Sequence, residues 1–110
     1  MTDAFKDRQK GFESKWAHDN ELRFKVVARR NKLLGLWAAK EMGFEEPRAK
    51  EYAMAVVAAD FEEAGDEDVF RKIRGDFDQA SIARDDRAIR SKMEELLAVA
   101  GEQIVSEASK

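Results

Sequence analysis

The sequence has no cysteine, one histidine, one proline and six glycines among its 110 residues. Without cysteine the chain can form no disulfide, thiolate metal site or cysteine nucleophile. A single histidine, His18, cannot supply a histidine cluster for a metal ion. Hydrophobic side chains make up 44% of the chain and charged ones 39%, a composition typical of soluble helical proteins. We therefore expect an all-α fold.

Long hydrophobic runs are also missing. No stretch approaches the roughly 20 apolar residues that a membrane helix needs, and no apolar run follows a basic N-terminal stretch as it does in a signal peptide. We expect no direct membrane insertion and a cytoplasmic location. The chain is long enough for one small domain with a single core.

Recognisable catalytic motifs are missing as well. The sequence has no glycine-rich phosphate-binding loop. Asp66 and Asp68 match the first two ligand positions of a calcium-binding loop, but Phe70 and Arg71 stand where that loop needs an oxygen ligand and a glycine. His18 lies just before the first predicted helix, where a helix-start or surface role is favoured over general-base catalysis. We therefore expect a binding protein that is no enzyme and requires neither a metal nor a cofactor.

What the sequence does contain is strong helical periodicity. Apolar spacing and capping residues predict four helices, at about residues 20–42, 47–64, 67–79 and 85–106. The first of them has apolar residues on two sides and should lie at the centre of the fold. Short connections favour antiparallel neighbours. The pattern predicts a four-helix bundle over residues 19–110.

Several residues are expected to mark the helix ends. Asp19 or Asn20 should begin the first helix, and Gly43 should end it in the left-handed conformation. Asp66 should cap the third helix, and Ser81 or Asp85 should begin the last.

Residues 1–18 carry a separate amphipathic pattern. At about 100° per residue, Phe5, Phe12 and Trp16 lie within about 40° of one another on a helix. Continued into the next segment, this stripe meets Arg23, so the pattern is out of phase with the first bundle helix. We interpret residues 1–18 as a mobile N-terminal arm that recognises a partner. Trp16 lies next to the bundle and could also fold back onto it in the free protein.

Charge is divided unevenly along the bundle. Residues 21–44 carry six basic and two acidic side chains, a net charge of +4, whereas residues 45–70 carry two basic and nine acidic ones, a net charge of −7. One interpretation is that these segments pack together and neutralise each other. The other is that the basic helix also binds an anion.

The spacing puts Arg29 in the middle of an apolar stripe. A guanidinium there needs either an acidic side chain on a neighbouring helix or an external anion. Together with Arg30, Lys32 and Trp37 it also has the chemistry to bind a phosphate group and a stacked base. Both alternatives stay open, and the second predicts a nucleotide site at Arg29, Arg30, Lys32 and Trp37.

Two consecutive segments resemble the zeta subunit family of alphaproteobacterial F-type ATP synthases: FESKWAHDN at residues 12–20 and ELRFKVVARRNKLLGLWAAK at residues 21–40. The block ARRNKLLGLWAA, residues 28–39, is the most specific part, and the likeness extends over essentially the whole chain. The resemblance implies a four-helix bundle whose mobile N-terminal region inserts into the catalytic head of the ATP synthase and blocks ATP hydrolysis. It also implies that some members bind ADP or ATP on the bundle.

The resemblance gives the arm a partner. Phe5, Phe12 and Trp16 would enter a cleft of the catalytic head, and charged residues such as Arg8 and Lys15 would contact its rim. We expect the free protein to be monomeric and, in the cell, peripheral to the membrane-bound enzyme.

Two other functions are to be weighed against this one. A helical adaptor for an unrelated protein remains an alternative, with the arm as an extension of the first helix. Nucleic-acid binding is disfavoured, because the chain is acidic overall and its positive charge is confined to one segment that must also pack.

Overall fold

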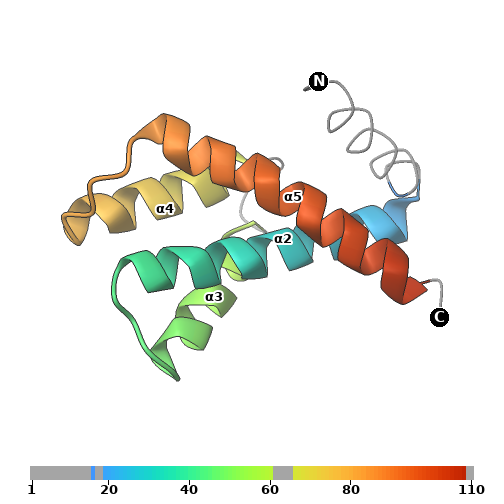
Figure 1. Cartoon of the computed structure of the whole chain (residues 1–110), viewed down its shortest axis with the longest axis horizontal. Helices are drawn as coiled ribbons and strands as arrows, with labels where there is room; N and C mark the ends of the chain where they lie inside the picture. Colours follow the sequence, from blue (N-terminus) through green and yellow to red (C-terminus); the bar gives the residue numbers. More distant parts are fainter. Residues whose placement is uncertain (1–15, 17–18, 61–65, 109–110) are drawn as a thin grey trace, which may run out of the picture.

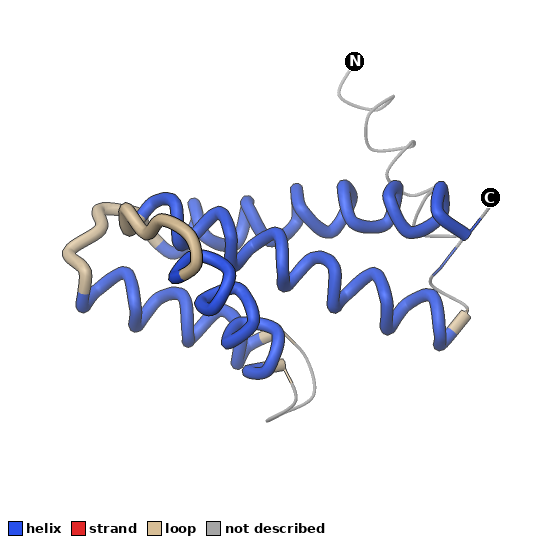
Figure 2. Tube along the Cα trace, turned by 90° about the horizontal axis from the view of Figure 1, so that it is seen from below, coloured by secondary structure: helices blue, strands red, loops and turns tan. Residues whose placement is uncertain are grey.

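The structure is a computed structural model that describes residue 16 and residues 19–60 and 66–108. Within these residues every regular element is a helix (Figure 2). The four helices are α2 (Asn20–Glu41), α3 (Arg48–Ala59), α4 (Glu67–Gln79) and α5 (Asp86–Ala108). The predicted all-α, four-helix fold is confirmed.

Helix α2 organises the bundle. It packs most extensively on α3 and α5 and also contacts α4, and further contacts join α3 to α4 and α4 to α5. The two longest helices, α2 and α5, cross in opposite directions (Figure 1). The contacts of α2 with all three other helices agree with the central position that its two apolar sides predict.

The sequence sets three of the helix ends as expected. Asp19 has an extended backbone, and its carboxylate accepts a hydrogen bond of 3.1 Å from the backbone N–H of Leu22. Gly43 follows α2 at a φ of 77°, which glycine adopts without steric cost. Asp85, rather than Ser81, caps the start of α5, and its carboxylate accepts a 2.8 Å hydrogen bond from the N–H of Ala88.

Two local predictions differ from the structure. The second helix was expected over residues 47–64, but α3 begins at Arg48 and ends at Ala59, while residues 61–65 lie outside the described part of the chain. The N–H of Asp60 bonds to the carbonyl of Val57, three residues back, which tightens the last turn. Asp66 stands before α4 but makes no side-chain cap bond, because its carboxylate pairs with Arg30 instead.

The core consists of two apolar clusters. The first is shared by all four helices and contains Leu34, Ala38, Val56, Val69, Phe70, Ile73, Phe77, Ile89 and Met93. The second lies between the N-terminal half of α2 and the C-terminal half of α5 and contains Trp16, Val26, Ala100 and Ile104. We call them the four-helix cluster and the Trp16 cluster. The Trp16 cluster marks the end of the bundle to which the arm is joined.

Candidate functional site

Most of the predicted partner-binding residues lie outside the described part of the chain. Phe5, Arg8, Phe12 and Lys15 belong to this group, so their contact with a partner stays a prediction. Trp16 is described, and only 6% of its surface is exposed. Its indole packs between α2 and α5, with Val26 on one side and Ala100 and Ile104 on the other. The structure thus shows the folded-back arrangement of Trp16.

Arg29, which was predicted to pair with an acid or to bind an anion, pairs with an acid. Its guanidinium donates two hydrogen bonds to the carboxylate of Glu107 on α5, at 2.9 and 3.0 Å, and a third of 2.7 Å to the side-chain oxygen of Gln103. The bidentate geometry favours planar recognition of the carboxylate. Arg29 therefore joins α2 to the last two turns of α5.

Arg30 is the most deeply buried charge among the described residues, with 1% of its surface exposed. It donates hydrogen bonds of 2.7 Å to the carboxylate of Asp66 and to the side-chain oxygen of Asn31. The Asp66 side chain is about half exposed, so water hydrates one member of this ion pair. The pair links the basic segment to the acidic one, which agrees in part with the idea that they neutralise each other.

A polar environment surrounds this buried guanidinium. Burial raises the pKa of Asp60 above its ordinary value, although the neighbouring Arg30 opposes the shift. Asn31 is also 1% exposed; its side-chain oxygen accepts from Arg30, and its side chain also faces the Asp60 carboxylate, where it opposes the rise in pKa. This part of α2 is therefore built as a buried polar centre, with acids supplied by the segment that connects α3 to α4.

The other two predicted nucleotide residues lie in different surroundings. Lys32 is exposed on α2. Trp37 packs against the four-helix cluster, with its ring centroid 5.5 Å from that of Phe77, and the Lys92 ammonium lies 5.7 Å from the Trp37 ring. None of the four residues lines any of three clefts in the described residues, at Phe44 and Tyr52, at Arg74 and Arg84, and at Arg87 and Arg90. The nucleotide site at these positions stays a prediction, and a ligand there would have to compete with Glu107 and Asp66.

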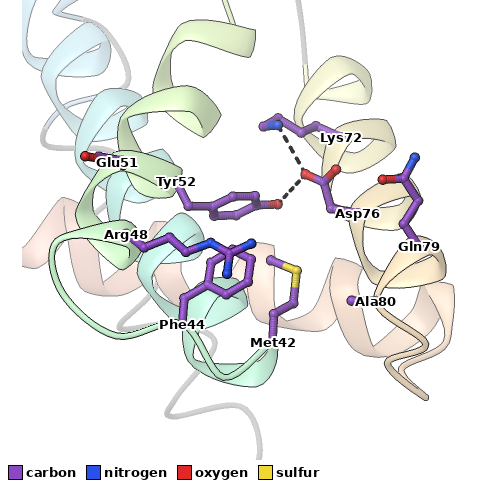
Figure 3. A pocket seen from close by; sticks show the side chains of 9 residues that line it. All are labelled: Met42, Phe44, Arg48, Glu51, Tyr52, Lys72, Asp76, Gln79 and Ala80. Atoms are coloured by element: carbon purple, nitrogen blue, oxygen red, sulfur yellow. Dashed lines mark hydrogen bonds and ion pairs between the residues drawn. The ribbon is translucent and has the colours of Figure 1, made fainter.

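The structure reveals a cleft that the sequence did not suggest. It has a volume of about 590 Å³ and lies between α3, α4 and the connection that follows α2 (Figure 3). Its lining comprises Met42, Phe44, Arg48, Glu51, Tyr52, Lys72, Asp76, Gln79 and Ala80. The cleft thus combines two aromatic rings with two basic and two acidic side chains.

The aromatic and charged groups of the cleft hold one another in place. Tyr52 donates a 2.7 Å hydrogen bond to the carboxylate of Asp76, which also pairs with Lys72 at 3.1 Å (Figure 3). The Arg48 guanidinium lies 3.7 Å from the centre of the Phe44 ring, and Phe44 meets Tyr52 edge to face at 5.8 Å. Burial, together with the hydrogen bond to Asp76 and its negative charge, raises the pKa of Tyr52, so its hydroxyl stays protonated.

This geometry suits an aromatic ligand that carries an acidic group. Arg48 is exposed and presents a planar cation beside an aromatic surface, which favours carboxylate or phosphate groups and stacked rings. The residues come from two helices and a turn, so no short motif in the sequence contains them. The one local signal was Phe44 with Arg48 on either side of Pro47, where an aromatic ring and a cation flank a turn.

The described residues hold no group of three or more metal-ligating side chains that could bind an ion. None of their helices has the length and apolar character needed to cross a membrane.

Comparison with known proteins shows the family. A family model described as ATPase inhibitor subunit zeta matches residues 1–103. A solution NMR structure is 50% identical in sequence, covers 78% of this chain and 98% of its own, and superposes with a TM-score of 0.70. A search of curated proteins gave no significant match. Because the family model spans nearly the whole sequence, the chain belongs to the ATPase inhibitor subunit zeta family, whose name denotes a regulatory subunit of an ATPase.

Proposed function

We propose that this protein inhibits ATP hydrolysis by an F-type ATP synthase, and that residues 1–18 insert into the catalytic head of the enzyme. The observation that carries the proposal is the break between arm and bundle. Helix α2 begins only at Asn20, behind an Asp19 with an extended backbone, and the aromatic stripe of the arm is out of phase with α2. The arm is therefore a separate unit that can be delivered to a partner.

The arm has the composition of a segment that orders on binding. It is rich in charge and has few apolar anchors, so its aromatic residues gain most when a preformed cleft buries them. Burial of each aromatic side chain contributes about 2–3 kcal/mol, before the entropic cost of ordering the arm is subtracted. Such an inhibitor acts as a wedge against rotation and needs no chemistry of its own.

The test is the full-length double variant Phe5→Ala/Phe12→Ala, assayed for inhibition of ATP hydrolysis by the isolated enzyme. We expect inhibition to be lost, because two of the three aromatic anchors are removed. Met54→Ala is the matched control, since Met54 lies on α3 with 59% of its surface exposed and the proposal gives it no role. Undiminished inhibition by the double variant would refute the arm mechanism.

Removal of the arm provides a second test. The sequence-based prediction is that deletion of residues 1–18 leaves a folded bundle and abolishes inhibition. Because Trp16 packs in the core, deletion of residues 1–15 is the cleaner experiment, since it keeps the Trp16 cluster intact. Circular dichroism would check the fold of each variant. A helical adaptor unrelated to the enzyme would instead fail to co-purify with ATP synthase from the native membrane fraction.

We further propose that the bundle binds ADP or ATP as a regulatory ligand. The sequence-based location is Arg29, Arg30, Lys32 and Trp37. The cleft at Phe44 and Arg48 supports a second location, because it already offers an open volume, an exposed guanidinium and aromatic rings. Titration of the isotope-labelled protein with ADP would distinguish them by which backbone amide signals shift. No shift at either place would refute the proposal.

A further inference from the structure

The Trp16 indole occupies a space that only glycine at position 101 leaves open. A methyl carbon built on Gly101, in the C-terminal half of α5, would lie 2.5 Å from the indole Nε1 and 3.2 Å from Cε2. The first distance is shorter than van der Waals contact allows, and a fused ring cannot bend away as a flexible chain can. The groove between α2 and α5 therefore has the shape of an indole, with Gly101 as its floor.

We propose that this groove is a binding site for the arm's own tryptophan and that it competes with the ATP synthase for the arm. This inference rests on the proposed inhibitory function, in which Trp16 is one of the three aromatic residues that contact the enzyme. A side chain with 6% of its surface exposed cannot at the same time be buried in a partner. Each molecule of inhibitor must therefore release Trp16 from the groove before the whole aromatic face of its arm can bind.

The backbone at Asp19 makes the two states mutually exclusive. We call the arrangement with Trp16 in the groove the seated state. In it Asp19 has an extended backbone, its carboxylate accepts the N–H of Leu22, and its own N–H donates to the carbonyl of Trp16 at 3.2 Å. If α2 instead continued as a helix through position 19, Trp16 would lie within about 20° of Arg23, which is exposed. The indole would then point to solvent, on the face that the sequence also assigns to Phe5 and Phe12.

Two substitutions weaken the seated state by different routes. Gly101→Ala fills the floor of the groove and displaces the indole. Asp19→Ala removes the N-cap at the start of α2 and places a good helix former where the helix would have to extend toward Trp16. Neither residue is assigned a contact with the enzyme. Gly75→Ala is the matched control, because Gly75 lies in α4 and a methyl group there meets no atom within 4 Å.

The first measurement follows Trp16 itself. In a Trp37→Phe background Trp16 is the one remaining tryptophan of the chain, so its emission and its quenching by acrylamide report its burial. We expect blue-shifted, protected emission in the parent and a red shift with faster quenching in Gly101→Ala and Asp19→Ala. Equal protection of Trp16 from acrylamide in the parent and in Gly101→Ala would refute the proposed binding of the indole in the groove. Circular dichroism establishes that each variant is folded.

The second measurement is the half-inhibitory concentration for ATP hydrolysis, with each substitution in the otherwise native full-length chain. Apparent affinity is the intrinsic affinity multiplied by the released fraction, and loss of a cap shifts that equilibrium by about fivefold. We therefore expect the half-inhibitory concentration to fall by up to about fivefold in Asp19→Ala and to fall in Gly101→Ala, but not in Gly75→Ala. An unchanged or higher value in variants whose indole is exposed would overturn the competition. If the native chain itself does not inhibit, the proposed function fails, while the quenching data still decide whether the seat exists.

Discussion

The close approach of α2 and α3 can be tested at Gly35. This residue is buried in the middle of α2, and a methyl carbon built on it would lie 2.6 Å from the Ala53 Cα and 3.2 Å from a methyl group of Val56. The nearest atom belongs to the backbone of α3, which cannot rotate aside. We therefore predict that Gly35→Ala pushes the two helices apart and destabilises the fold.

The expected magnitude combines two opposing terms. Overpacking of a filled core costs about 1–3 kcal/mol. Replacing glycine by alanine in the middle of a helix returns about 0.8–1 kcal/mol, because alanine loses less backbone entropy. We expect a net loss of up to about 2 kcal/mol for Gly35→Ala.

Gly75→Ala isolates the steric term. It provides the same gain in helix propensity on α4 with no atom within 4 Å of the new methyl group, so it should stabilise the protein by about 0.5–1 kcal/mol. Urea denaturation, followed by circular dichroism and compared through the midpoints at constant m value, gives both free energies. If Gly35→Ala were as stable as Gly75→Ala, the proposed tight contact between α2 and α3 would be wrong.

Three further substitutions test the polar groups. Asp66→Asn should destabilise the protein to urea by about 1–3 kcal/mol, because it leaves the buried Arg30 guanidinium without its carboxylate; an unchanged midpoint would mean that water already compensates Arg30. Asp60→Asn should raise the melting temperature at neutral pH, since a raised carboxyl pKa means that the charged form is the less stable one in the folded state. The gain should vanish in acid below about pH 3.9, where the aspartate is protonated in both states, and a pH-independent difference would contradict the assignment. Tyr52→Phe should cost about 1 kcal/mol in urea denaturation, and the native tyrosine should show no phenolate absorbance near pH 10, where a free tyrosine ionises, until the protein unfolds.

The fold could be predicted from the sequence because local signals and periodicity agreed. The carboxylates of Asp19 and Asp85 cap the starts of α2 and α5, and Gly43 follows the end of α2 with a positive φ. The end of α3 could not be predicted in the same way. Apolar periodicity predicts a helix to residue 64, but α3 ends at Ala59, where the N–H of Asp60 bonds to Val57 three residues back, and no local signal in the sequence marks that tighter turn.

The site was harder to predict, because periodicity gives the face of a residue but not its depth. Arg29 and Arg30 are adjacent in the sequence and look equally basic. Only the packing of the four helices shows that Arg30 is buried with Asp66, while Arg29 reaches across to Glu107. The cleft was missed for a related reason: Tyr52, Lys72 and Asp76 carry no local motif, and they meet only when α3 packs beside α4.

The two apolar clusters lie at different ends of the bundle and differ in how many helices contribute to them. This difference bears on function. The four-helix cluster takes side chains from all four helices, whereas the Trp16 cluster takes them from α2, α5 and Trp16 alone. Release of Trp16 would expose Val26 and Ala100 but leave the four-helix cluster and the ion pair of Arg29 with Glu107 in place. The cost of presenting the arm is then local and does not approach the free energy of global unfolding. An inhibitory arm that must detach from its own bundle to bind the enzyme is best joined at the end with the Trp16 cluster, because Trp16 can be released there without loss of the fold.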